Sequence, residues 1–280
     1  MSESGVLYIV ATPIGNLSDV SQRAISVLAD VDVIAAEDTR HSGKLMQHLN
    51  IDTKLVALHE HNETQKAKWF VEQLQSGKHV ALISDAGTPL ISDPGYHIVR
   101  IAREAGIKVS PIPGACAVIA ALSAAGLATD KFQFCGFLPV KAVAKTKELE
   151  SLKQRHCTSI YYEAPRRVVD TLTSMVEVLQ HDRQIVLAKE LTKNFETFVS
   201  GNSETVLSWL NEEPARTKGE FVLLIEPAKN DDDALPAESI HLLTLLMTEL
   251  PLKKAAAIAA QHTGVKKNDL YKVGLELAGK

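Results

Sequence analysis

The stretch HVALISDAGTPLISDPG, at residues 79–95, decides the fold of this 280-residue chain. Its first residues are almost all apolar, which is typical of a strand that is buried on both faces. The rest is a run of turn-forming residues, and we predict a helix directly after it over residues 96–105. A plain tight connection needs far fewer residues, so the run indicates a ligand-binding loop at the carboxyl end of the strand. The Asp85 carboxylate and the bare backbone of Gly87 suit a polar, charged small molecule.

The sequence around this loop alternates between strand and helix patterns. We expect strands at residues 6–11, 31–36, 54–58, 79–84 and 108–112, and helices at 21–30, 41–49, 63–76 and 96–105. This alternation predicts an α/β domain, residues 1–113, whose parallel sheet is covered by helices on both faces. The Pro-Ile-Pro-Gly run at 111–114 marks its end.

A second α/β domain is predicted over residues 114–228. It begins with an Ala-rich helix at 115–125, followed by strands at 132–137, 158–162, 184–189, 195–200 and 219–225 and helices at 143–154, 168–179 and 203–210. The charged residues 229–233 indicate a linker. Residues 235–280 form a third, helical domain, with helices at 237–250, 252–262 and 267–278. Gly264 separates the last two in a helix-turn-helix pattern.

The composition limits the class of protein. With 45% hydrophobic residues the chain can bury more than one core, and its formal net charge of −4 excludes a generic polyanion binder. The three cysteines, Cys116, Cys135 and Cys157, are scattered and form no CxxC pair, which indicates buried thiols in a reducing compartment. The first ten residues lack a secretory pattern, and the small-residue run at 115–127 is too short for a membrane span. We therefore expect a cytoplasmic protein.

The turn after the first strand, ATPIGNL at residues 11–17, lacks the GxGxxG fingerprint, and no Walker A motif follows any strand. Nicotinamide chemistry and ATP hydrolysis therefore lose support. Pro13 and Gly15 end a central strand, so this turn either faces the same crevice as Asp85 or is an ordinary strand-to-helix connection.

Charged residues also follow the second strand, where the sequence reads Glu37-Asp38-Thr39-Arg40. They form either a substrate-binding or proton-handling cluster, or a helix start that Asp38 or Thr39 caps. The two interpretations are compatible, because one residue can cap while the others point into the cleft.

His59-Glu60-His61 places two histidines on one face of an extended segment, but no third ligand is obvious nearby, so we expect no metal. Asn62 is more simply an N-cap for the helix that follows.

Glu163, Arg166 and Arg167 lie at the end of a second-domain strand, in the run YYEAPRR. Paired arginines at a helix start oppose the helix dipole, which favours an anionic substrate over a purely structural role. The basic segment 141–156, which holds Lys145, could join them and Lys193 in one positive patch, although such runs are usually solvated faces.

Together these motifs resemble the tetrapyrrole methylase superfamily and, within it, the bacterial 16S ribosomal RNA ribose 2′-O-methyltransferase I family. The matching stretches follow one another over nearly all of residues 7–226: LYIVATPIGNLSD, AEDTRHSGKL, LHEHNE, SDAGTPLISDPG, PIPGACAVIAALSAAGL, GFLP, YYEAPRR, KELTK and KGEFVLLIE. The C-terminal LPLKKAAAIAAQHTGVKKNDLY resembles the helix-turn-helix domain of this RNA-modifying branch, which corrin and porphyrin methylases usually lack.

The resemblance implies a homodimer of two-domain subunits with S-adenosylmethionine in the cleft between the α/β domains. The acceptor would be 16S ribosomal RNA or the small ribosomal subunit. Carried over residue by residue, the cofactor positions are Pro13, Asp85, Gly87, Thr88, Cys116, Ala117, Tyr162 and Gly219. The RNA-binding candidates are Arg40, Glu163, Arg166, Arg167, Lys266 and Lys267.

Methyl transfer to a ribose hydroxyl needs an aligned acceptor and help in removing its proton. The candidate groups are Glu37, Asp38, Glu163, Lys189 and Glu190, and we rank Glu37 and Lys189 first because each follows or ends a predicted strand. Two other interpretations stay open: a methylase that acts on a tetrapyrrole, and an RNA-binding module whose cleft is only structural. The helical C-terminal domain argues against the first, and the ligand loop argues against the second.

Overall fold

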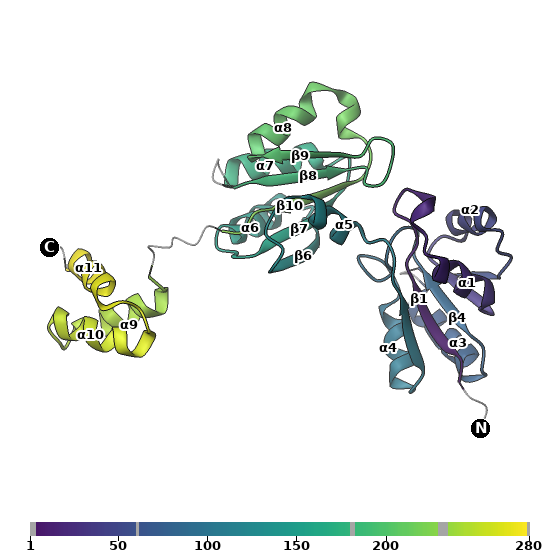
Figure 1. Cartoon of the computed structure of the whole chain (residues 1–280), viewed down its shortest axis with the longest axis horizontal. Helices are drawn as coiled ribbons and strands as arrows, with labels where there is room; N and C mark the ends of the chain where they lie inside the picture. Colours follow the sequence, from purple (N-terminus) through teal and green to yellow (C-terminus); the bar gives the residue numbers. More distant parts are fainter. Residues whose placement is uncertain (1–3, 60–61, 180–182, 229–234, 279–280) are drawn as a thin grey trace. The chain divides into compact units, whose positions relative to one another are not determined.

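The structure is a computed structural model and describes residues 4–59, 62–179, 183–228 and 235–278. The chain forms two compact units, and the boundary between them falls after Ala228. The first unit contains two five-stranded sheets, and the second contains helices α9 to α11 (Figure 1).

The first sheet is wholly parallel and has the strand order β3-β2-β4-β1-β5. Apolar side chains of α3 and α4 pack on one face and those of α1 and α2 on the other, which confirms the prediction of a parallel sheet covered on both sides. Its elements are β1 (Val6–Val10), α1 (Gln22–Asp30), β2 (Val33–Ala36), α2 (Thr39–Leu49), β3 (Leu55–Ala57), α3 (Glu63–Gln75), β4 (Val80–Ile83), α4 (Tyr96–Glu104) and β5 (Lys108–Ile112).

The centre of this sheet explains where the site lies. The strands β2, β4 and β1 are neighbours, and all four residues of β4 are buried between the helix layers. Because the strands are parallel, their carboxyl ends meet at one edge. The turn that holds Pro13, the cluster after β2 and the loop after β4 therefore emerge side by side.

The second sheet is mixed and has the strand order β6-β7-β10-β8-β9. Only β6 and β7 run parallel, while β10 pairs antiparallel with both β7 and β8. Its elements are α5 (Ala117–Ala124), β6 (Phe132–Phe137), α6 (Ala142–Leu152), β7 (Thr158–Glu163), α7 (Val168–Leu179), β8 (Ile185–Lys189), β9 (Thr197–Gly201), α8 (Ser203–Glu212) and β10 (Phe221–Ile225).

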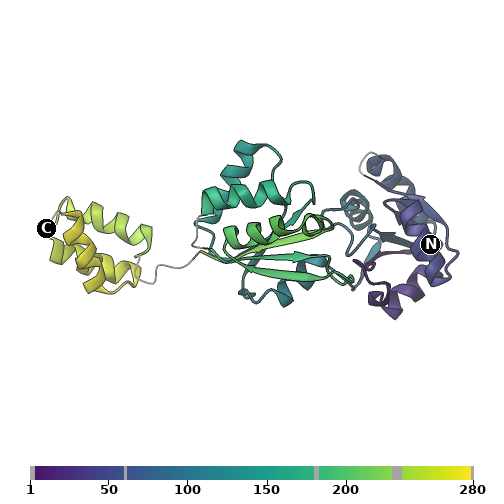
Figure 2. The same ribbon diagram turned by 90° about the horizontal axis from the view of Figure 1, so that it is seen from above.

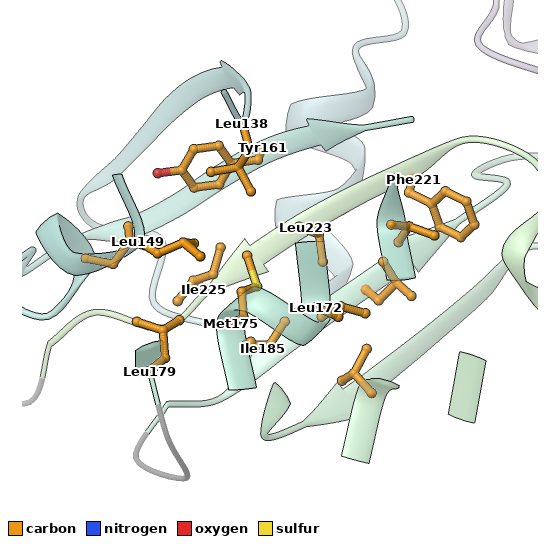
Figure 3. Close-up of a cluster of buried hydrophobic side chains, with 14 of the residues drawn as sticks. Leu138, Leu149, Tyr161, Leu172, Met175, Leu179, Ile185, Phe221, Leu223 and Ile225 are labelled. Carbon is orange, nitrogen blue, oxygen red and sulfur yellow. The ribbon is translucent and has the colours of Figure 1, made fainter. Parts of the chain in front are cut away.

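Helices also cover both faces of this second sheet. On one face α6, α7 and α8 pack against the strands, with Leu172, Met175 and Ile185 at the centre of a large apolar cluster (Figure 3). On the other face α5 packs against residues such as Ile160 and Val222. The alternating inward and outward side chains of the strands thus divide between two cores.

The second unit is a bundle of α9 (Ala237–Met247), α10 (Leu252–Thr263) and α11 (Lys267–Leu277), coloured yellow-green to yellow in Figure 2. A small core that includes Leu243 and Leu270 holds the three helices together. Gly264, with a φ of 73°, ends α10 in the left-handed conformation and lets the chain turn into α11. None of the described helices is long and apolar enough to span a bilayer.

Several boundaries differ from the sequence-based predictions for local reasons. Helix α2 begins two residues early because the Asp38 side chain accepts the Arg40 N–H and caps it. Asn62 occupies the N-cap of α3, but its side chain bonds the His59 N–H and the Ala57 carbonyl instead of the helix. Short 3-10 helices at Leu17–Asp19 and Pro214–Thr217 were not predicted.

The cysteines are only partly buried rather than fully buried as predicted, and Cys116 and Cys135 pack against the edges of the apolar cores. The two remaining residues of the considered metal motif, Glu60 and His61, lie outside the described residues, and so does the predicted linker at 229–233.

Candidate functional site

A half-open cavity of about 810 Å³, part of it open solvent, lies where loops of the two sheets meet. The residues that line it come from the turn after β1, the loop after β4, the start of α5, and strands or loops of the second sheet: Ile14, Ala86, Gly87, Thr88, Ile91, Asp93, Cys116, Ala117, Phe137, Tyr162, Glu163, Leu191, Glu220, Phe221 and Val222.

The near end of the loop after β4, residues 84–95, is fixed by backbone contacts. Gly87 exchanges two hydrogen bonds with Thr12, at 2.9 and 3.1 Å, and Thr88 donates its hydroxyl to the Ala115 carbonyl at 3.0 Å. Gly87 has a φ of 83°, and a Cβ there would lie 3.1 Å from Ile14. The position therefore favours glycine, and the loop is joined to both the β1 turn and the entry to α5.

The far end of the same loop is held by a buried carboxylate. Glu63 at the start of α3 accepts the Gly95 N–H at 3.0 Å and the His97 N–H at 2.8 Å. These donors lie at the N-terminus of α4, where a negative charge is favourable. The sequence predicts Glu63 only as a helix start within LHEHNE, and the structure shows that it also anchors the ligand loop.

Between these anchors the loop adopts an unusual backbone. Leu90 and Ser92 have φ values of 72° and 70°, in a region that non-glycine residues rarely occupy. They flank Ile91, which lines the cavity. Such strained residues cluster at ligand sites, where the surrounding structure holds them in place.

The loop between β8 and β9 repeats this arrangement on the other side. Glu190 and Thr192 have φ values of 52° and 64° and flank the cavity-lining Leu191. The Lys193 ammonium lies 2.8 Å from a carboxylate oxygen of both Glu190 and Glu220. Although burial opposes both shifts, this pairing raises the pKa of Lys193 and lowers that of Glu190.

An aromatic wall completes the second-sheet side of the cavity. The Tyr162 ring makes edge-on contacts with Phe134 at 4.8 Å and with Phe137 at 5.7 Å between centroids. Burial, with smaller contributions from Cys116 and Asp93, raises the pKa of Tyr162, so its phenol is neutral near pH 7.

Two acidic residues with accessible side chains, Asp93 and Glu220, also line the cavity, whereas the Glu163 side chain is fully buried. Burial raises the pKa of Asp93; a hydrogen bond from Ser84 opposes the shift and the Asp85 charge adds to it. Apolar walls, an aromatic pair and carboxylates in one cavity suit a ligand with a flat ring and a cationic centre.

The structure brings five of the expected cofactor positions into this lining: Gly87, Thr88, Cys116, Ala117 and Tyr162. Pro13, Asp85 and Gly219 are not among the lining residues, but each is a chain neighbour of one. The Asp85 carboxylate accepts the Asp38 N–H at 3.1 Å, and thus joins the loop after β4 to the cluster after β2.

The two residues ranked first as catalytic do not line the cavity either. Glu37 accepts the Asp85 N–H at 3.5 Å, which places it beneath the ligand loop. Lys189 is buried as the last residue of β8, opposite Phe221 and Thr197 in the sheet. Both residues therefore belong to the elements that support the cavity and not to its lining.

The interpretation of the YYEAPRR motif requires a correction. The Glu163 side chain is 0% exposed and accepts hydrogen bonds from the Ala164 N–H and the Thr171 hydroxyl, while Arg167 pairs with it at 3.2 Å and donates to the Leu138 carbonyl. These contacts give Glu163 and Arg167 the structural role that the sequence did not reveal. Arg166 is exposed.

The other basic candidates are likewise either paired with carboxylates or exposed. Lys145 is buried in a pair with Asp170, Arg155 pairs with Glu148, and Lys193 pairs within its loop, so the considered positive patch is largely neutralised. Arg40 is highly exposed but bonds Asp38 through two contacts. Lys266 and Lys267 are exposed at the start of α11 in the second unit.

Sequence reasoning missed several lining residues: Ile14, Ile91, Asp93, Phe137, Leu191 and Glu220. All six lie inside motifs on which the resemblance rested, close to the residues that were singled out there. Glu220 follows Gly219 directly, and Asp93 follows Asp85 within one loop, so the motifs themselves were the available signal.

Comparisons with known proteins show the family to which the chain belongs. Residues 6–207 match the family model described as Tetrapyrrole (Corrin/Porphyrin) Methylases, and residues 233–278 match the RsmI C-terminal HTH domain. The chain is 54% identical over 274 residues to the ribosomal RNA small subunit methyltransferase I of Pasteurella multocida, with 98% of each chain covered. It is 53% identical to the protein of that name from Escherichia coli O157:H7, with 99% of this chain and 97% of the other covered.

Among solved structures, uroporphyrin-III-C-methyltransferase from Thermus thermophilus matches with a TM-score of 0.56 and 18% identity, covering 80% of this chain and 95% of that one. At this identity the likeness shows the fold alone. Enzymes of the matched family take their methyl group from S-adenosylmethionine. The chain is therefore a methyltransferase of the tetrapyrrole methylase family, and within it belongs to the ribosomal RNA small subunit methyltransferase I family.

Proposed function

We propose that this enzyme methylates the 2′-hydroxyl of a cytidine ribose in the 16S ribosomal RNA of the small subunit. The observation that carries the proposal is the near-complete match to enzymes named ribosomal RNA small subunit methyltransferase I, at 50–54% identity. That match includes the C-terminal helical unit as well as the cavity-bearing unit. The names of these relatives specify small-subunit ribosomal RNA, and the ribose 2′-hydroxyl and the cytidine are what we propose beyond them.

The cavity residues fit S-adenosylmethionine, which supplies an electrophilic methyl group on a positively charged sulfur. Gly87 and Ala117 are small residues of the lining, and a Cβ at Gly87 would lie 3.1 Å from Ile14, another lining residue. Ile14, Leu191 and Val222 offer apolar surface for an adenine ring. The acidic lining offers counter-charges for cationic groups, so the residues present are compatible with the cofactor.

Asp93 is our candidate for the group that removes the acceptor proton. It lines the cavity, unlike Glu37 and Lys189, and its raised pKa brings its basicity closer to neutral pH. Its carboxylate must be ionised to act as a base. The rate should therefore fall as the pH drops through the raised pKa of Asp93.

Asp93→Asn separates a base from a cofactor ligand. If Asp93 is the base, the substitution should lower kcat by about 100- to 10,000-fold and leave the dissociation constant of S-adenosylmethionine almost unchanged. A weakened cofactor affinity with an unchanged kcat would instead identify Asp93 as a counter-charge for the donor.

The second unit is proposed to contact the RNA. Lys253 and Lys254 are exposed at the start of α10, and Lys266, Lys267 and Lys272 are exposed on or just before α11. In a helix-turn-helix the start of the last helix approaches a nucleic-acid backbone or groove. Each lysine–phosphate contact adds to the affinity and to its dependence on salt.

Truncation after Lys229 tests this assignment. The shortened protein should fold and bind S-adenosylmethionine normally, because the cavity belongs wholly to the first unit. Its affinity for small subunits should fall, and the slope of log affinity against log salt should become shallower. An unchanged affinity and slope would show that the helical unit does not hold the RNA.

The assembly and location are proposed in line with this function. We propose a homodimer in the cytoplasm, where ribosomal subunits are assembled. Analytical ultracentrifugation at several concentrations tests the dimer, and fractionation of cells tests the location. A tetrapyrrole acceptor has less support, because the solved uroporphyrin-III-C-methyltransferase and cobalt precorrin-4 methyltransferase share only the fold with this chain, at 18% identity.

The main experiment is incubation of the enzyme with labelled S-adenosylmethionine and small ribosomal subunits from cells that lack the protein, followed by nuclease mapping. The expected result is label at one cytidine that resists alkaline cleavage, as 2′-O-methylation requires. Naked 16S ribosomal RNA serves as a second substrate and shows whether the assembled particle is needed. Label on a base, or no label on either substrate, would overturn the proposal.

A further inference from the structure

Phe137 is an aromatic side chain with no evident structural reason to be exposed. The residue is 51% exposed although it lines the cavity. Leaving a phenylalanine in water forgoes the favourable free energy of burying an apolar ring. A ligand that covers the ring at the cavity rim would remove this cost.

The backbone of β6 is shaped so that the ring reaches the rim. The pairing of β6 with β7 is regular from Phe132 to Phe134 and then shifts before Phe137. Gly136, with a φ of 68°, lies within the irregularity. Such bulges re-aim a side chain next to a site. Here the result is that Phe137 contacts Tyr162 edge-on and keeps part of its surface free.

The other exposed phenylalanine of the same strand lacks these features. Phe132 is 43% exposed at the first position of β6, in the regular part of the ladder, and does not line the cavity. The two residues therefore share strand, type and exposure but differ in their relation to the site.

Two arginines follow β7, the strand that pairs with β6. Arg167 donates to the Leu138 carbonyl, which binds the turn after β7 to the residue that follows Phe137. Its chain neighbour Arg166 is exposed and makes no ion pair within the described part of the chain. Whereas Arg167 is occupied by Glu163, Arg166 is available to a ligand.

We propose that Phe137 and Arg166 form a subsite for one unstacked nucleotide of the acceptor RNA, with its base on the Phe137 ring and a phosphate on the Arg166 guanidinium. The inference rests on the proposed function in taking RNA as the acceptor. Enzymes that act on a nucleotide inside a concave site draw it out of the base stack and hold the base against aromatic side chains. Arginine pairs well with phosphate because its planar donors match the oxygen geometry.

Substitutions at Phe137 test whether its ring stacks on a base, with Phe132 on the same strand as the comparison. Phe137→Ala should raise the KM for small subunits about 10- to 100-fold, as expected for the loss of one stacking contact, without changing the affinity for S-adenosylmethionine. Phe137→Tyr should keep near-normal KM, whereas Phe137→Leu, which is apolar but cannot stack, should resemble Phe137→Ala. Phe132→Ala is the matched control and should behave like the wild type.

Substitutions at Arg166 test the phosphate contact. Arg166→Ala should weaken binding of small subunits and reduce the slope of log affinity against log salt by about one unit. Lys131→Ala removes another exposed cation, at the opposite end of β6, and should leave both quantities unchanged.

A direct binding assay keeps the inference separate from the proposed function. A short oligocytidylate is titrated into each full-length variant in the presence of S-adenosylmethionine, and quenching of protein fluorescence is followed. Phe137→Ala and Arg166→Ala should bind it more weakly than the wild type even if the natural acceptor were another RNA. Wild-type affinity for the oligonucleotide in both variants would overturn the subsite. A wild-type enzyme that fails to methylate small subunits would overturn only the proposed function.

Discussion

Two loops border the cavity, and each aims one apolar side chain into it by means of two left-handed residues. In the loop after β4 these residues flank Ile91, and in the loop after β8 they flank Leu191. The first loop is held by backbone hydrogen bonds and by the buried carboxylate of Glu63. The second also has backbone hydrogen bonds, such as that from the Glu190 N–H to the Glu220 carbonyl at 2.9 Å, but its charged contacts are a partly exposed cluster of Lys193 with two glutamates.

This difference separates two ways to stabilise a strained backbone. Hydrogen bonds to a buried carboxylate are shielded from water, so their strength depends little on salt. Ion pairs near the surface gain less and weaken as salt rises or as either partner changes its charge. The first loop should therefore keep its conformation as salt and pH change, whereas the stability of the second should depend on both.

The largest expected effect is that of removing the Glu63 carboxylate. Glu63→Ala leaves the buried Gly95 N–H without its partner and should lower the free energy of unfolding by about 2–4 kcal/mol. It should also weaken S-adenosylmethionine binding, because the far end of the loop is released. Urea unfolding and calorimetry measure the two quantities.

Two further variants decide whether this is a specific anchor. Glu63→Gln keeps an acceptor oxygen and should recover much of the cofactor affinity. Glu72→Ala removes an exposed carboxylate from the same helix and should change stability by less than about 0.5 kcal/mol. Equal losses in Glu63→Ala and Glu72→Ala would contradict the contrast between the two loops.

A glycine beside each loop offers a second comparison. A Cβ at Gly219, where φ is 98°, would lie 2.6 Å from the Glu190 carboxyl carbon. Gly219→Ala should cost about 2–3 kcal/mol of stability, and Gly87→Ala about 1–2 kcal/mol because its contact with Ile14 is looser.

The loss of stability caused by Gly219→Ala should be smaller when Lys193→Met is also present, because Glu190 is then free to move. Thermal unfolding of the two singles and the double variant gives the coupling. Additive losses would show that the Lys193 cluster does not hold Glu190 in place.

The smallest effect concerns the ion pairs themselves. Lys193→Met should cost about 1 kcal/mol near neutral pH, and high salt should reduce this loss. The folded protein lowers the pKa of Glu190, so that its contribution is present above the ordinary glutamate pKa and disappears as the pH falls through the folded value. The raised pKa of Lys193 acts in the alkaline direction, where its contribution is lost as the pH rises.

The stability difference between wild type and Lys193→Met should therefore close below about pH 4. Lys218→Met, which removes a nearby exposed cation, is the control. A difference that persists unchanged in acid would mean that Lys193 contributes through packing alone.

Most of the fold could be predicted from the sequence because it depends on local patterns. The strands Lys108–Ile112 and Phe132–Phe137 and the helix Val168–Leu179 have the predicted bounds, and the other predicted elements differ by a few residues. The loop after β4 was also identified, since turn-forming residues follow a buried strand there. In each case hydrophobic periodicity and turn chemistry are properties of neighbouring residues.

The site was only partly predictable because it depends on distant partners. Nothing near Arg167 reveals that it will meet Glu163 and the Leu138 carbonyl, or near Lys145 that it will meet Asp170. The direction of Ile91 results from left-handed turns at leucine and serine, which are not residue types that signal such a backbone. Side-chain pairs between distant residues and strained turns could therefore not be predicted from the sequence.

The central claim is that the cavity at the start of α5 holds S-adenosylmethionine, and calorimetric titration of Ala117→Phe tests it most directly. Ala117 lines the cavity, so a phenyl ring there should lower the cofactor affinity by at least about tenfold in a folded protein. Ile119→Phe, two residues along the same helix at an exposed position outside the lining, should bind the cofactor like the wild type. A folded Ala117→Phe protein with wild-type affinity would contradict the claim.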